Sequence, residues 1–323
     1  MAVKYRDFSD IHPMWRAVLA YNTYDYDGRE NVISATSIMK PTHMVVLERS
    51  NNGTDKEISI EGMIPSMYGT SIHDRAEMAL NNTENKIWKL LGVPKPETLE
   101  ISTEVRKEVE IGTHIVSGKY DLMFRYDGSL WELCDYKTMS VWAFMIDKKG
   151  KIEEFVKQMS IYRYLNQDKE ISDLATVLVL FTDWSKSDSI IKAKAGYPQR
   201  RVDSEQVPLW SLDETKKYLK SQEASIVDGM ARYIKHGKTG YACSEKERWV
   251  KKSGFAYYAK AGAKRATKIC ETEDQAQTLL LKAKDPTAYI VERKAQSTRC
   301  SYCSVTEFCD AYSDMLITGE VKI

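Results

Sequence analysis

One tight turn constrains the fold of this chain more than any other feature of its sequence. The segment Tyr126-Asp127-Gly128-Ser129 contains Asp-Gly, the strongest short-range signal for a β-hairpin. Residues 115–125 before the turn and residues 130–137 after it have the composition of strands. The sequence therefore predicts an antiparallel pair of strands near the middle of the chain.

Further strands and several helices are expected around this hairpin. The predicted strands cover residues 104–111 and 174–182, and the predicted helices cover residues 34–40, 69–91, 151–165 and 213–236. Pro41 is expected to limit the first helix. Ser211 and Glu214 form a capping box before the last helix, and Gly237 lies just past its end. This alternation of helices and strands indicates an α/β fold.

Composition excludes several classes of protein. The 323 residues are 43% hydrophobic and 29% charged, which excludes a disordered or fibrous chain. The net charge of +1 gives no global sign of nucleic-acid binding. Apolar runs fall far short of the ~20 residues that a membrane span needs, and the N-terminus lacks the pattern of a secretory signal. We therefore expect a soluble cytoplasmic protein with no membrane partner, in which the six cysteines are reduced or bind metal.

Two carboxylates on the predicted hairpin point to metal chemistry. Asp121, in Gly118-Lys-Tyr-Asp121, and Asp135 lie on opposite arms, so their side chains can converge. Such a pair is repulsive unless a divalent cation neutralises it, and hard oxygen ligands suit Mg²⁺ or Mn²⁺. Lys137 follows Asp135 by two residues and therefore shares its face of the strand. Its ammonium is placed to orient a water or to stabilise charge on a phosphodiester under attack.

Residues on the neighbouring helices extend this set. His73 lies near the start of the helix before the hairpin, where an imidazole can complete a metal shell. Gln158 and Tyr162 lie four residues apart on the helix after it and share a face, suited to hydrogen bonds with a nucleotide or with the lysine. Each signal is weak alone, and a structural role is the ordinary explanation for each.

Together, the motifs resemble those of the PD-(D/E)XK nuclease superfamily in its RecB-type branch. The family pattern is a helical His, a carboxylate strand, Gly-x-x-Asp, Asp/Glu-x-Lys and a helix with Gln-x-x-x-Tyr. This chain presents the same order over residues 69–165, as His73, Glu104, Asp121, Asp135-Tyr136-Lys137 and Gln158-x-x-x-Tyr162. The resemblance implies a restriction-endonuclease-like α/β core, a central mixed sheet flanked by helices.

The resemblance also assigns roles to these residues. It implies that His73, Asp121, Asp135 and the backbone carbonyl of Tyr136 hold Mg²⁺ or Mn²⁺. It further implies that Lys137 is catalytic with Asp121, Asp135 and Glu104, although Glu108 and Glu110 compete with Glu104 for the upstream carboxylate. Gln158 and Tyr162 would position the DNA or the lysine.

The function implied is a metal-dependent DNA exonuclease acting on single-stranded DNA or on free ends. Phage-type recombination, replication or DNA degradation would be its setting, with recombination or replication proteins as partners and the host cytoplasm as its location if a phage encodes it. Two alternatives stay open: a structure-selective endonuclease on the same site, and a non-catalytic DNA-binding or assembly module. The sequence identifies no interface between copies.

The cysteines past residue 237 predict a second metal centre. Cys300-x-x-Cys303-x5-Cys309 brings three thiols together and needs a fourth ligand. The resemblance implies a [4Fe-4S] cluster, with zinc as the alternative. Relatives place the fourth cysteine before the nuclease core, whereas this chain has none before Cys134, and Cys243 is preferred. Cys134 is expected in the core, and Cys270 in a strand.

A basic segment over residues 251–268 predicts a path for single-stranded DNA. It contains six Lys or Arg residues and no acidic residue, and Phe255, Tyr257 and Tyr258 are interleaved as potential stacking partners for bases. Lys260, Lys264 and Arg265 are the candidate DNA contacts, and a solvated charged hairpin is the alternative. The expected organisation is an N-terminal segment 1–68, a nuclease core 69–236 and a small basic, cysteine-metal subdomain 237–323.

Overall fold

The computed structural model describes residues 3–6, 11–21, 27–52, 56–81, 98–187 and 196–321. The chain forms two compact units, one of Met1–Lys40 and Gly53–Ser225, the other of Pro41–Asn52 and Ile226–Ile323. The functional division at residues 68 and 236 stays a prediction, because these units are defined by compactness alone. Within the described residues, no helix combines the length and the apolar character needed to cross a bilayer.

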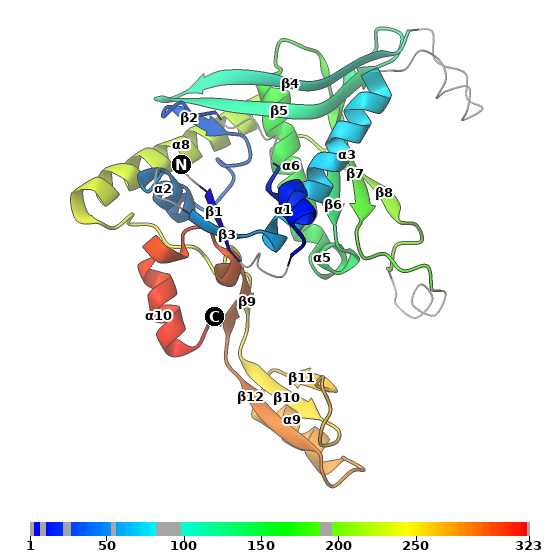
Figure 1. Ribbon diagram of the computed structural model, residues 1–323, viewed down its shortest axis with the longest axis vertical. Coiled ribbons are helices and arrows are strands. Elements are labelled where there is room, and N and C mark those ends of the chain that lie inside the picture. Colours follow the sequence, from blue (N-terminus) through cyan, green and yellow to red (C-terminus); the bar gives the residue numbers. More distant parts are fainter. Residues whose placement is uncertain are drawn as a thin grey trace. The chain divides into compact units, whose positions relative to one another are not determined.

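A six-stranded mixed sheet forms the centre of the first unit (Figure 1). Its strands are β2 (Val32–Ser34), β4 (Glu100–Ile111), β5 (His114–Arg125), β6 (Trp131–Met139), β7 (Ile171–Phe181) and β8 (Val202–Pro208). The order is β2-β5-β6-β7-β8, with β4 paired to β5. The β2–β5 and β6–β7 pairs are parallel, and the β4–β5, β5–β6 and β7–β8 pairs are antiparallel. The predicted α/β class with a mixed sheet is confirmed.

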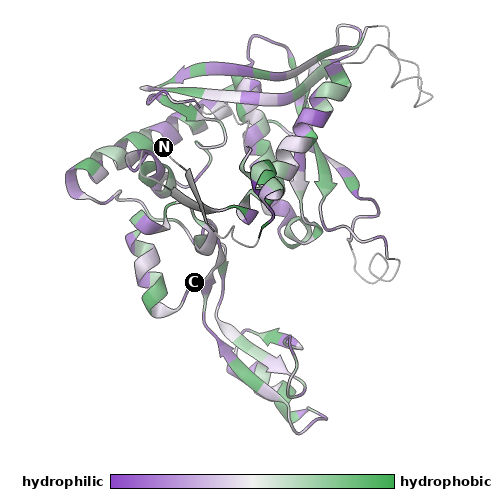
Figure 2. Cartoon of the chain, in the orientation of Figure 1, coloured by the Kyte–Doolittle hydropathy of each residue, from purple (hydrophilic) through white to green (hydrophobic). Residues whose placement is uncertain are grey.

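The predicted hairpin turn joins β5 to β6. Asp127 and Gly128 have φ angles of 50° and 69°, and the Ser129 amide donates to the Tyr126 carbonyl over 2.8 Å. Positive φ angles at both residues are the backbone conformation for which Asp and Gly are favoured in hairpin turns. The longest pair is β4 with β5, along which hydrophobic and hydrophilic residues alternate (Figure 2).

Helices flank this sheet. They are α1 (Pro13–Ala20), α3 (Ile64–Asn81), α5 (Val141–Ile146), α6 (Lys148–Leu165) and the first part of α8 (Leu212–His236), which belongs to the second unit from Ile226 onward. A short parallel pair, β1 (Val3–Arg6) and β3 (Lys56–Ser59), completes the unit. The Glu214 amide donates to Ser211 Oγ over 3.2 Å and the Ser211 amide donates to Glu214 Oε2 over 2.8 Å, which confirms the capping box. Gly237 follows with a φ of 68°, as a helix end requires.

Two helix boundaries differ from expectation. The helix α3 starts at Ile64, five residues before the predicted start, and residues 82–91 of the predicted helix lie outside the described residues. The predicted helix over 34–40 is wrong: β2 ends at Ser34, turns follow, and a helix starts after Pro41. Proline ends a preceding helix, but its fixed φ angle also suits the start of a new one. The prediction considered only the first of these effects for Pro41.

The second unit is built from short elements. They are α2 (Thr42–Ser50), β9 (Val250–Lys251), β10 (Gly254–Tyr258), β11 (Lys268–Cys270), α9 (Glu273–Leu281), β12 (Tyr289–Arg293), β13 (Gln296–Ser297), the 3₁₀ turns η2 (Thr298–Tyr302) and η3 (Thr306–Phe308), and α10 (Asp310–Thr318). A small antiparallel sheet has the order β11-β10-β12 and packs against α9 (Figure 1). Cys270 ends β11, which confirms its predicted place in a strand, and it is buried.

Candidate metal centre

The strands β5 and β6 separate where the two predicted aspartates lie. Their paired register ends at Leu122 opposite Cys134. Just beyond this point, the Tyr136 amide donates to Asp121 Oδ2 over 2.8 Å. Asp121 and Asp135 are 8% and 1% exposed. The end of the ladder therefore places two buried carboxylates side by side.

Three potential metal ligands converge at this point. His73 Nδ1, from α3, lies 3.4 Å from Asp121 Oδ1 and 3.5 Å from Glu104 Oε1. The other ring nitrogen, Nε2, lies 3.3 Å from the Tyr136 carbonyl oxygen. Among the described residues, His73, Glu104 and Asp121 are the one set of three His, Cys, Asp or Glu residues whose ligand atoms all lie within 4.8 Å of one another. One imidazole and two carboxylates are a donor set that suits a divalent cation such as Mn²⁺ or Mg²⁺.

Glu104 reaches this set through a distorted strand. Its φ is +53°, in the left-handed region that residues with a side chain rarely adopt, although it lies in the middle of β4. Thr103 and Val105 on either side remain paired with Leu122 and Tyr120, so Glu104 lies opposite Asp121. Such a conformation costs on the order of 1–3 kcal/mol and is concentrated at functional sites. Lys119 Nζ, 2.5 Å from Glu104 Oε2, holds the carboxylate in place.

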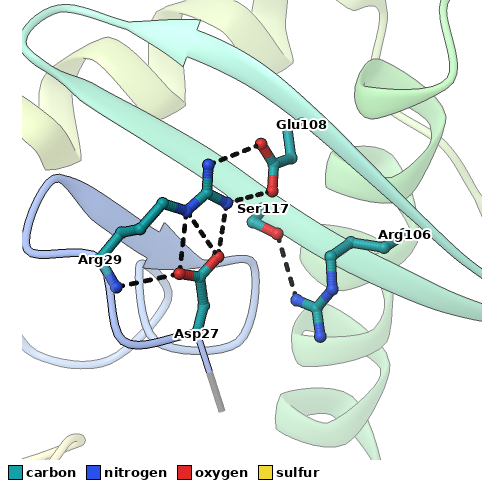
Figure 3. A network of polar contacts seen from close by, with 5 residues as sticks. All are labelled: Asp27, Arg29, Arg106, Glu108 and Ser117. Atoms are coloured by element: carbon teal, nitrogen blue, oxygen red, sulfur yellow. Dashed lines mark hydrogen bonds and ion pairs between the residues drawn. The ribbon is translucent and has the colours of Figure 1, made fainter. Parts of the chain in front are cut away.

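The two competing glutamates lie elsewhere. Glu108 is exposed, and its Oε1 lies 2.5 Å from Arg29 Nη2, in a network that also contains Asp27 (Figure 3). Glu110 is exposed at the far end of β4. Of the three candidates for the upstream carboxylate, Glu104 is therefore the one that lies beside Asp121.

Asp135 lies beside the three-residue set and contacts the lysine. Lys137 Nζ is 2.5 Å from Asp135 Oδ2, so the two side chains share a face as predicted. Gln158 Nε2 donates to Asp135 Oδ1 over 3.3 Å and to the Tyr162 hydroxyl over 3.0 Å. Gln158 and Tyr162 are both buried. Their contacts are with Asp135 and with each other, which suits them to position the carboxylate; the predicted contact with DNA is untested.

The electrostatics of this centre favour added positive charge. Burial, and then repulsion from Asp135, raise the pKa of Asp121 to about 7. The hydrogen bond to Glu104, and then the charges of Asp121 and Asp135, raise the pKa of His73 despite its burial. Burial alone would lower the pKa of Lys137, but Asp135 and Asp121 raise it above its ordinary value. A divalent cation would relieve the repulsion that otherwise keeps a proton on Asp121.

The glycine of the Gly-x-x-Asp motif has a packing role. A Cβ at Gly118 would lie 2.6 Å from Leu165 Cδ1 and 3.0 Å from Tyr162 Cε1. Only a residue without a side chain therefore allows α6 to approach β5 this closely. Because Tyr162 holds Gln158 and Gln158 holds Asp135, this close approach sets the position of the carboxylate.

An open cavity of about 980 Å³ adjoins the lysine. Tyr136 and Lys137 line it, together with β7, β8 and residues 196–200. Arg200 supplies a cation and Tyr197 and Pro198 supply apolar surface. The cavity therefore places a cation and apolar surface on the same side of the sheet as the lysine.

The cysteines behave as two groups. Cys134 is 3% exposed, and burial raises the pKa of its thiol to about 12, which fits the predicted core position. Burial, followed by the charges of Glu247, Cys303, Cys309 and Cys300, raises the pKa of Cys243 to about 11. The four predicted ligands therefore influence one another electrostatically, but no three of them have sulfur atoms that all lie within 4.8 Å of one another. Sequence reasoning missed His43, whose Nε2 is 3.3 Å from Cys309 Sγ; the helix α2 that carries it was not predicted.

The basic segment lies on the small sheet of the second unit. Its six basic side chains are exposed, including the candidate DNA contacts Lys260, Lys264 and Arg265. Of the interleaved aromatic residues, Tyr257 is buried and Tyr258 stacks on Tyr289 with ring centroids 4.6 Å apart. The expectation that Tyr257 is free to stack on bases is therefore wrong, because its side chain belongs to the core of the small sheet. The basic side chains are accessible, and their contact with DNA is untested.

Comparison with known proteins gives only distant structural similarities. No protein family and no curated protein matches this chain. Similar solved structures include SSO0001, at 14% identity and a TM-score of 0.40, covering 62% of this chain and 78% of that one. An alkaline exonuclease, LHK-Exo from Laribacter hongkongensis, has 12% identity and a TM-score of 0.38, covering 69% and 96%. A phage-related exonuclease from Haemophilus somnus has 14% identity and a TM-score of 0.35, covering 62% and 83%. The chemistry of the site is judged from its own residues.

Proposed function

We propose that this chain is a metal-dependent deoxyribonuclease, and that it acts as an exonuclease on DNA ends. The observation that carries the proposal is the convergence of His73, Glu104 and Asp121 within 4.8 Å beside the Asp135–Lys137 pair. A half-buried lysine next to clustered, largely buried carboxylates is costly for a purely structural site, because each charge loses part of its hydration. The preference for ends over internal bonds follows the family resemblance alone.

The side chains divide the work of hydrolysis. His73, Glu104 and Asp121 would hold Mg²⁺ or Mn²⁺, with Asp135 and the Tyr136 carbonyl completing the shell. The cation would lower the pKa of a water molecule, which makes it a better nucleophile toward the phosphorus, and would neutralise negative charge on the phosphodiester. The Lys137 ammonium, held 2.5 Å from Asp135, would orient that water and stabilise the charge that develops on the phosphate oxygens. Gln158 would keep Asp135 in position from the buried side.

The second unit would support this activity through a metal centre and a DNA contact. We propose that Cys300, Cys303 and Cys309 hold a thiophilic metal centre, a [4Fe-4S] cluster or zinc, for which the sequence predicts Cys243 as the fourth ligand. The Cys-x-x-Cys-x5-Cys spacing supports the assignment, and so do the charge effects that these thiols exert on one another. The centre would stabilise the fold and take no part in hydrolysis. The exposed cations Lys260, Lys264 and Arg265 would contact DNA phosphates.

Cleavage of matched linear and circular DNA tests the proposed function. The substrates are end-labelled linear DNA and circular DNA, each single- and double-stranded, with Mg²⁺, Mn²⁺ or EDTA and anaerobically purified protein. We expect loss of linear DNA only, abolished by EDTA and by Asp135→Asn, whereas Glu108→Gln, a carboxylate outside the site, retains activity.

Each other outcome identifies an alternative. Cutting of circles would replace the exonuclease with an endonuclease on the same site, because an exonuclease needs an end. DNA binding without cleavage by fully metallated protein would leave a binding or assembly module. Cleavage that survives Asp135→Asn would overturn the site assignment.

A further inference from the structure

His43 is held in one orientation within the second unit. Its Nδ1 lies 2.7 Å from Thr239 Oγ1, and its Nε2 lies 3.3 Å from Cys309 Sγ. Two contacts join the helix α2, which carries His43, to the cysteine segment. Ser304 Oγ donates to Glu48 Oε1 over 2.6 Å, and Arg299 contacts Met44 Sδ at 3.9 Å. The imidazole is therefore fixed between a buried hydroxyl and a thiol.

The hydrogen bonds around Thr239 determine which ring nitrogen carries the proton. Thr239 Oγ1 donates its one proton to the Tyr241 carbonyl over 3.1 Å and accepts from the Tyr241 amide over 3.1 Å. Its second lone pair is left to accept from His43, so Nδ1 is the protonated nitrogen. In the neutral ring, Nε2 then carries the free lone pair, and this lone pair faces Cys309.

This arrangement is typical of a histidine that binds a metal. Metal-binding histidines donate their second ring N–H to an oxygen acceptor, which fixes the tautomer and the ring plane. A nitrogen and a sulfur bound tetrahedrally to one zinc ion, at about 2.1 and 2.3 Å, lie about 3.6 Å apart. The observed separation of 3.3 Å is close to that value, so these two atoms are placed to bind one metal. Cys300 and Cys303 would move toward this pair on metal binding, because no three of the four ligand atoms lie within 4.8 Å of one another in this structure.

We propose that His43 Nε2 is the fourth ligand of the cysteine centre, together with Cys300, Cys303 and Cys309. The inference rests on the proposed centre itself. A Cys₃His set is a known ligand set for structural zinc, and an imidazole also replaces thiolate in some iron–sulfur centres. Cys243 is then a neighbouring thiol of the centre and not a ligand.

Metal content and spectroscopy of matched variants test this assignment. The full chain is purified anaerobically as wild type, His43→Gln, His43→Cys, Cys243→Ser and Cys303→Ser, with His236→Gln as a control at an exposed histidine. Iron, acid-labile sulfide and zinc are measured per chain. Nitrogen coupling is then measured by pulsed electron paramagnetic resonance on the reduced cluster, or the ligand-field absorption is measured after Co²⁺ replaces zinc.

We expect His43→Gln to lower the metal content to less than a tenth of wild type, and Cys243→Ser and His236→Gln to leave it unchanged. His43→Cys should restore metal and abolish the nitrogen signature. Because His43→Gln can also disturb folding, the secondary structure of each variant is compared by far-ultraviolet circular dichroism. The nitrogen signature of the wild-type protein tests histidine ligation without any variant.

Full metal in His43→Gln together with its loss in Cys243→Ser would overturn the proposal and return the fourth position to Cys243. A wild-type centre with no nitrogen coupling would also overturn it. If Cys303→Ser kept all of its metal, or if wild type bound none, the proposed cysteine metal centre would be refuted. The assignment of His43 as its fourth ligand would then be refuted as well.

Discussion

Replacing Asp121 by asparagine should stabilise the metal-free protein while destroying its activity. In the absence of a cation, Asp121 is a buried carboxylate beside Asp135, and its pKa of about 7 lies well above its ordinary value of 3.8. A carboxyl group whose pKa is raised by folding binds more protons in the folded than in the unfolded state. Between the two pKa values the free energy of unfolding therefore falls as the pH rises.

The size of the effect follows from this shift. With pKa values of 3.8 and about 7, the charged carboxylate costs about 4 kcal/mol at pH 8 and about 1.7 kcal/mol at pH 5. An asparagine side chain in place of Asp121 would carry no charge, and its amide oxygen can still accept from the Tyr136 amide. The stability gained by Asp121→Asn should therefore grow by about 2.5 kcal/mol from pH 5 to pH 8.

Urea unfolding in EDTA measures this difference directly. Wild type and Asp121→Asn are compared at pH 5 and pH 8, and Glu108→Gln serves as a control at an exposed carboxylate. Excess Mn²⁺ should reverse the order at pH 8, because the wild type gains binding energy that the variant lacks. A stability difference that is the same at both pH values, or destabilisation by Asp121→Asn at pH 8 in EDTA, would refute the reasoning.

Three further predictions concern packing, the cysteines and the basic segment. Gly118→Ala should lower the free energy of unfolding in urea by about 1–3 kcal/mol, because the added methyl group displaces α6. It should reduce DNA cleavage more than metal binding. Unchanged stability would contradict the close packing of α6 on β5 at Gly118. Cys303→Ser should lose the metal of the second unit, whereas Cys134→Ser should keep it, as measured by elemental analysis. Equal loss of metal in both variants would contradict the assignment of Cys303 as a ligand and of Cys134 as a core residue. Neutralising three exposed cations to glutamine should reduce the slope of log binding constant against log salt for single-stranded DNA by up to about 2, and an unchanged slope would exclude them as phosphate contacts. Those residues are Lys260, Lys264 and Arg265.

The hairpin and the side-by-side placement of Asp135 and Lys137 could be predicted because they depend on local signals. The Asp-Gly turn fixes two arms of a hairpin, and the two-residue period of a strand then places Lys137 beside Asp135. The capping box at Ser211 is likewise a local pattern. These features depend on residues near one another in the sequence, where backbone geometry leaves few alternatives.

The rest depends on contacts that no local pattern encodes. Glu104, Glu108 and Glu110 are equivalent in an alternating strand, and the left-handed backbone at Glu104 distinguishes them only in the folded chain. His43 lies far from Cys309 in sequence, and it follows Pro41, which starts a helix as readily as it ends one. The interleaved aromatic and basic residues of this segment look the same in the sequence whether Tyr257 faces solvent or the core of the small sheet, so its burial could not be predicted.

Binding of Mn²⁺ at the three-residue set tests the central claim most directly. Wild type, Glu104→Gln and Glu108→Gln are titrated with Mn²⁺, bound metal is measured by electron paramagnetic resonance, and cleavage of linear DNA is measured in the same samples. We predict that Glu104→Gln weakens Mn²⁺ binding at least tenfold and loses cleavage in proportion, and that Glu108→Gln matches wild type in both. Equal Mn²⁺ affinity and equal cleavage in all three proteins would contradict the assignment of His73, Glu104 and Asp121 as the metal site.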